Sequence, residues 1–219
     1  MIVLRSGDMV IFEEPSSAKF IKALQVIANV LHPAFESLLP TPGKSKESCV
    51  LCSLTVRDFL HRIGFKGARV TTVYLALVAH DAEGNEVHSA GCGDHLAGRV
   101  PTMPGVKPAR ETPGYWNGHM VVEVPSVGYL IDTTLAPMWR KQWPKLPGMM
   151  AVPTFTDGLP AYGMERMSGI ESDQGNGNTL QMIWLREPNE GWRSGGDATN
   201  KELRRPVVLA LRSAFGKLR

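Results

Sequence analysis

Three residues of this chain have the types and the order that acyl transfer by a thiol requires: Cys49, His119 and Asp132. Cys49 follows Ser48, a residue type that caps helices, and opens an amphipathic segment over 49–63. In the first turn of a helix, a thiol faces backbone N–H groups without intrahelical partners and the positive end of the helix dipole, which favour its thiolate. The same N–H groups can hold the oxyanion that forms when a thiolate attacks a carbonyl. Cys49 is therefore the predicted nucleophile.

His119 and Asp132 are expected to lie side by side on the two strands of a hairpin. If the four residues between Val124 and Tyr129 form the loop, Val124 pairs with Tyr129, and Val121 lies opposite Asp132. Because side chains alternate along a strand, His119 and Val121 share one face, where Asp132 is the diagonal neighbour of His119. A diagonal of about 7 Å lets a carboxylate reach an imidazole nitrogen, which is how a base is oriented for a cysteine nucleophile.

The sequence around these residues resembles the transglutaminase-like branch of the papain-like cysteine enzymes, which is related to the arylamine N-acetyltransferases. Residues 49–69 resemble the family's nucleophile helix running into Leu-Gly-hydrophobic-x-Ala-Arg, 119–124 its His-Ala-Trp-Val-Glu-Val strand, and 129–134 its Trp-hydrophobic-x-Asp-x-Thr strand. The family places its cysteine 15 residues before the glycine, and Cys49 lies 15 residues before Gly64. The resemblance therefore also assigns the nucleophile to the first cysteine of the helix, the base to the histidine and the orienting role to the aspartate.

This resemblance implies a fold and an activity. The expected fold is α+β with a papain-like, transglutaminase-like core over 45–135, in which the nucleophile helix packs on an antiparallel sheet. The chain 1–219 is then a single domain, with a C-terminal extension over 150–219 of unknown role. The implied reaction is hydrolysis of an amide or peptide, or transfer of the acyl group to an amine, through a Cys-His-Asp triad and an acyl-enzyme. The partner is a substrate containing an amide, ester or thioester, no cofactor is required, and coenzyme A is a substrate only if the protein is an acetyltransferase.

Apolar periodicity predicts the elements that would position these residues. A helix over 18–39 is expected to end or kink at Pro33, and a terminal helix over 199–218 is expected to begin near Pro206. Residues 137–178 show little periodic pattern. One early helix followed by strands favours an α+β protein with an antiparallel sheet. The expected strands are two within 2–13, 70–79, a short one near 86–89, 120–124, 129–132, and 180–185 with a partner near Trp192.

The three cysteines, taken together with one histidine, offer a different chemistry. Cys49, Cys52, Cys92 and His95 have a spacing that a structural zinc site can use, and the chain would then be a non-enzymatic binding protein. The alternative for Cys52 is a core thiol one helical turn below the nucleophile, since free cysteine is among the most buried residue types.

Two residues in the segment Trp116-Asn117-Gly118, which immediately precedes His119, are candidates for lining the site. Asn117 can donate a hydrogen bond to an oxyanion, and Trp116 can shield the imidazole and its carboxylate from water. The alternative is a loop whose aromatic ring simply fills the core.

Composition sets the remaining expectations. The 219 residues are 43% hydrophobic and 21% charged, which is typical of a globular chain. The net charge of +3 is weak for a nucleic-acid-binding protein, so no such partner is expected. No apolar run reaches the roughly 20 residues of a membrane span, and a membrane partner is not expected either. Three cysteines, an odd number, argue against a secreted disulfide framework and favour a cytoplasmic location.

Overall fold

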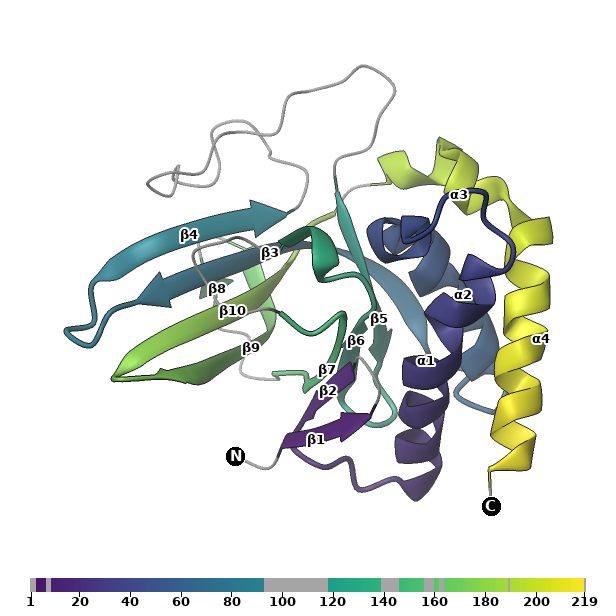
Figure 1. The fold of residues 1–219 in the computed structure, drawn as a ribbon, viewed down its shortest axis with the longest axis horizontal. Coiled ribbons are helices and arrows are strands. Elements are labelled where there is room, and N and C mark those ends of the chain that lie inside the picture. Colours follow the sequence, from purple (N-terminus) through teal and green to yellow (C-terminus); the bar gives the residue numbers. More distant parts are fainter. Residues whose placement is uncertain are drawn as a thin grey trace.

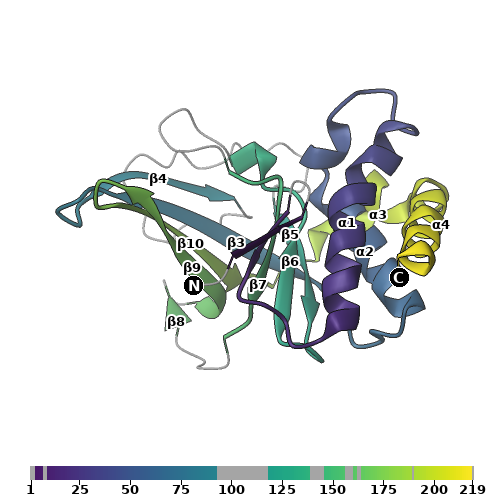
Figure 2. The same ribbon diagram turned by 60° about the horizontal axis from the view of Figure 1, so that its bottom comes forward.

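The structure, a computed structural model, describes residues 3–6, 9–92, 118–138, 146–155, 160–161, 164–188 and 190–218. One curled sheet with a layer of helices against it makes up this part of the chain (Figures 1 and 2), so the expected α+β class is confirmed. The strands are β1 Val3–Ser6, β2 Met9–Phe12, β3 Arg69–His80, β4 Glu86–Cys92, β5 His119–Val124, β6 Tyr129–Asp132, β7 Met149–Pro153, β8 Pro160–Ala161, β9 Met164–Gly175 and β10 Asn178–Arg186. The α-helices are α1 Ala18–Glu36, α2 Cys49–Arg62, α3 Gly196–Thr199 and α4 Lys201–Lys217, and the 3₁₀ helices are η1 Lys44–Glu47, η2 Ala136–Met138 and η3 Gly191–Ser194.

The sheet is mixed rather than purely antiparallel. Its strand order is β1-β2-β7-β6-β5-β3-β10-β9-β8, with β4 also paired to β3. The described strand pairs are antiparallel except for β2 and β7, which run parallel and correct the sequence-based expectation. β5 pairs with Arg69–Val73, whereas β4 pairs with Leu75–His80. The other edge of β3 is occupied by β10. The strands β4 and β5 therefore lie end to end along one edge of β3, which brings Cys92 close to His119.

The two faces of the sheet are covered in different ways. Helices α1 and α2 lie against one face around β5 and β6, with α4 packed on the outer side of these two helices (Figure 2), and the other face closes on itself as the sheet curls. The backbone N–H of Phe155 donates to the Met167 carbonyl at 2.8 Å, and the Ser168 hydroxyl donates to the Pro153 carbonyl at 2.7 Å, which joins the end of β7 to β9. Side chains under the helices include Phe20, Leu24, Leu51, Phe59, Leu60, Val122, Val124, Ile131 and Leu211, and those inside the curl include Val73, Leu75, Val121, Leu130 and Trp184.

Two helices pass through prolines where the sequence suggested a boundary. α1 begins after Ser17, whose hydroxyl accepts the Phe20 N–H at 3.3 Å, and it continues through Pro33. α4 begins five residues before Pro206, because Asn200 caps it by accepting a backbone N–H. Both prolines lie on exposed sides of their helices, where the missing hydrogen bond is outweighed by the packing of the opposite face. Within the described ranges, no helix combines the length and apolar character that crossing a membrane requires.

The C-terminal part of the chain is not an appendage. β7 and β9, which the sequence did not predict, join the sheet, and β9 is held along its length by β10. β10 also pairs with β3, and α4 packs on α1 and α2. The strand expected near Trp192 is wrong, since this residue lies in η3. The expected extension over 150–219 is thus built into the same sheet and helical layer as the earlier segments.

Candidate active site

The start of α2 places Cys49 beside the first residue of β5. α2 packs against β5, and the Ser53 hydroxyl fixes the two elements by donating to the Met120 carbonyl at 2.9 Å. The Cys49 thiol donates to the carbonyl oxygen of Gly118 at 3.8 Å, and it lies beside the His119 side chain at the same cavity. Ser48 precedes the helix as expected, but its hydroxyl donates to the Lys44 carbonyl at 3.1 Å instead of capping α2. The first N–H groups of α2 therefore receive no side-chain cap.

The hairpin brings His119 and Asp132 into contact. Val124 pairs with Tyr129, which confirms the predicted register, and side-chain alternation then turns the histidine and the aspartate to one face. His119 Nε2 lies 2.7 Å from Asp132 Oδ2. Both side chains are buried, at 2% and 0% exposure, so no water competes for this hydrogen bond. Because Nε2 is engaged by the carboxylate, Nδ1 is the nitrogen left for the Cys49 thiol.

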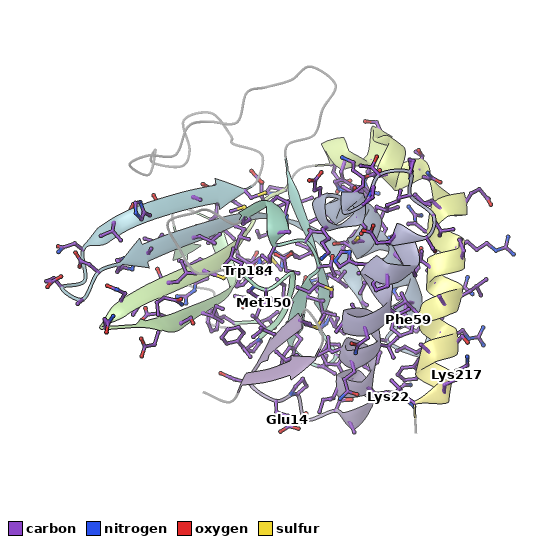
Figure 3. All side chains as sticks on the ribbon, viewed as in Figure 1. Glu14, Lys22, Phe59, Met150, Trp184 and Lys217 are labelled. Atoms are coloured by element: carbon purple, nitrogen blue, oxygen red, sulfur yellow. The ribbon has the colours of Figure 1, made fainter. Side chains whose placement is uncertain are left out.

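Two further donors hold the Asp132 carboxylate. The indole N–H of Trp184, on β10, donates to Oδ2 at 2.9 Å, and the backbone N–H of Thr134 donates to Oδ1 at 3.1 Å. Trp184 is fully buried in the middle of the curled sheet (Figure 3). Sequence reasoning placed it only within an apolar strand. A tryptophan in a buried strand indicates that its indole N–H has a hydrogen-bond acceptor. The sequence does not identify that acceptor as Asp132.

The pKa of His119 is raised well above its ordinary value. Burial alone would lower this pKa, because an imidazolium is poorly solvated in the protein interior. The nearby carboxylate of Asp132, the nearby Cys92, the hydrogen bond from the ring to Asp132 and the adjacent Cys49 together outweigh burial and raise the pKa of His119. The site therefore favours the protonated form of the His119 imidazole.

The second cysteine of α2 faces the core. Cys52 is fully buried, and its thiol donates to the Ser45 carbonyl at 3.2 Å. Burial raises the pKa of this thiol well above its ordinary value, and the nearby Cys49 and Asp197 add to the effect. These contacts match the core-thiol alternative stated for Cys52.

A cavity of about 510 Å³ opens onto Cys49 and His119. It is lined by residues from η1 and the start of α2, the end of β4 and the start of β5, the segment from Thr134 into η2, and the segment from η3 to α3. Cys92 lies in this lining, but the three cysteines and the described acidic and histidine residues do not gather into a group that could hold a metal ion. His95, Trp116 and Asn117 fall outside the described residues, so the zinc alternative and the two lining roles stay predictions.

Removing the indole N–H tests the support of Asp132. Trp184→Phe is expected to lower the free energy of unfolding by about 1–3 kcal/mol, because a hydrogen bond to a buried carboxylate is lost. Urea unfolding measures this change. The same replacement made in an Asp132→Asn background should cost clearly less, since the charged acceptor is already gone. Equal costs in both backgrounds would show that ring volume, not the hydrogen bond, stabilises the protein.

The three functional candidates thus converge, although they come from a helix and two strands separated in the chain. Cys49, His119 and Asp132 lie in series: the thiol is at the cavity beside the imidazole, and the imidazole is hydrogen-bonded to the carboxylate buried behind it. The chain matches no family model, no curated protein and no solved structure.

Proposed function

We propose that this protein is a thiol-dependent acyl-transfer enzyme with a transglutaminase-like core. The observation that carries the proposal is the hydrogen bond between the His119 imidazole and the Asp132 carboxylate, with the Cys49 thiol beside that imidazole at the cavity and with Trp184 and Thr134 fixing the carboxylate. A nucleophile next to a base that a third group orients is the arrangement that covalent catalysis by cysteine uses. The open cavity beside the thiol leaves room for a substrate carbonyl.

In the first half of the reaction, the Cys49 proton moves to His119 Nδ1, and the thiolate sulfur bonds to the carbonyl carbon of an amide, ester or thioester. The tetrahedral oxyanion accepts hydrogen bonds from first-turn N–H groups of α2, that of Cys49 included, which no side chain caps. When the carbonyl re-forms, the leaving group departs and takes the proton from His119. Asp132 holds the imidazole in one tautomer and stabilises its charged form.

In the second half, water or an amine attacks the thioester carbon. His119 takes a proton from the attacking group, and the Cys49 sulfur leaves and recovers a proton. The products are an acid or an amide and the free enzyme. These reaction steps use only the side chains of the site and its backbone N–H groups. Coenzyme A enters only as an acyl donor for transfer to an amine.

Acylation by an activated ester tests the proposal directly. Incubation with p-nitrophenyl acetate is expected to release a burst of nitrophenol and to add one acetyl group to the protein, which peptide mapping should locate on Cys49. Pretreatment with iodoacetamide should alkylate the same residue and abolish the burst. Acetylation spread over surface lysines with no burst would contradict the assignment.

A further inference from the structure

The cavity beside Cys49 has a wall that belongs to the C-terminal region. Trp192, Gly195, Gly196 and Asp197, from η3 to α3, line it. The helix α3 lies beside α2 (Figure 1). Trp192 is largely buried and packs in one apolar cluster with residues of α2 and β5. The wall is thus anchored to the same elements that carry the nucleophile and the base.

Arg204 of α4 fixes the backbone of this wall. Its side chain is only 5% exposed, and Nη1 donates to the carbonyl of Asp197 at 3.3 Å and to that of Ala198 at 2.7 Å. The compensating charge for this guanidinium is Asp58, whose Oδ2 lies 3.8 Å from Arg204 Nε. The backbone of Asp197 is therefore held in place, while its side chain lines the cavity.

Of the charged residues that line this cavity, Asp197 is the one whose side chain has no partner among the described residues. Lys44 and Glu47, which also line the cavity, pair with each other at 3.7 Å, and His119 pairs with Asp132. No hydrogen bond or ion pair engages the Asp197 side chain within the described part of the chain. Its charge nevertheless reaches the start of α2, where it helps to raise the pKa of Cys52.

We infer that the substrate carries a positively charged group beside its reactive carbonyl, and that the Asp197 carboxylate binds this group. The inference rests on the proposed function, since it names the substrate class of the same site. An ammonium or guanidinium seated against the α3 wall would place the adjoining carbonyl over Cys49, within one cavity. Because Asp197 is exposed to water, the expected selectivity for a cation over a matched neutral group is about 2- to 5-fold.

A matched pair of thioesters measures this selectivity. Acetylthiocholine carries a quaternary ammonium, and its uncharged isostere replaces that nitrogen by carbon. The rate of Cys49 acetylation, followed by intact mass, is expected to favour acetylthiocholine by about 2- to 5-fold in the unmodified protein. In Asp197→Asn the ratio should approach one, and in Asp197→Lys it should fall below one. Glu202→Gln, which removes an exposed carboxylate of α4 outside the cavity, should keep the unmodified ratio.

A second measurement separates this inference from the proposed function. Cationic and anionic methanethiosulfonate reagents label a thiol without needing an acyl-enzyme. The ratio of their labelling rates at Cys49 is expected to drop several-fold in Asp197→Asn and to be unchanged in Glu202→Gln. If neither thioester acetylates Cys49, the proposed function and the substrate class fall together. If both acetylate it equally well in the unmodified protein, or if Asp197→Asn leaves both ratios unchanged, only the role of Asp197 is overturned.

Discussion

Cys49→Ala is expected to abolish acyl-enzyme formation and to lower turnover by at least about 10⁴-fold, the scale seen when a catalytic nucleophile is removed. The side chain is half-buried at the first position of α2, where alanine is a good helix former. Stability should therefore change by no more than about 1 kcal/mol. Steady-state rates with an activated ester, intact mass after incubation, and urea unfolding measure these three quantities.

Cys52→Ala is the matched control, because the two cysteines lie one turn apart on the same helix. Its buried sulfur packs in the core and donates to the Ser45 carbonyl, so its removal should cost about 1–2 kcal/mol of stability. Most of the acylation rate should remain. If the acyl group or the alkylating label were found on Cys52, the nucleophile and the mechanism built on it would be wrong.

The parts of the site that sequence could predict are governed by local geometry. The four-residue loop sets the hairpin register, so the pairing of Val124 with Tyr129 and the meeting of His119 with Asp132 follow from alternation alone. The start of α2 is equally local, since the polar loop before it and the amphipathic pattern after it fix Cys49 at the first turn. These features needed no knowledge of the rest of the fold.

The parts that sequence missed depend on contacts between distant segments. Trp184 is 52 residues from the carboxylate it supports, and no spacing rule links the two. Asp197 and Arg204 lie just before and within the predicted final helix, whose expected start is near Pro206 because proline is favoured in the first turn of a helix. The side chain of Asn200 caps the helix earlier and overrides that preference. Tertiary pairing with β10 likewise forms β9 from a segment of weak β pattern.

Asp132→Asn is expected to change both the rate and its dependence on pH. The replacement keeps the shape of the side chain but removes the charge that raises the pKa of His119. With that charge gone, burial again dominates, and the pKa of His119 should fall toward or below its ordinary value of about 6.5. Because the thiolate–imidazolium pair is the reactive state, activity is lost on the alkaline side as His119 gives up its proton. The alkaline limb should therefore move to lower pH in Asp132→Asn.

The rate at the optimum should also fall, by about 10²- to 10⁴-fold, since an amide no longer fixes the tautomer of His119. Profiles of kcat/KM and of Cys49 alkylation from about pH 5 to about pH 10 measure both changes. Glu171→Gln removes an exposed carboxylate of β9 and should leave both profiles unchanged. A merely structural role for Asp132 would lower activity in proportion to the folded fraction and leave the position of the alkaline limb unaltered. An unmoved limb in a folded Asp132→Asn protein would therefore remove the carboxylate from the mechanism, even with a large loss of rate.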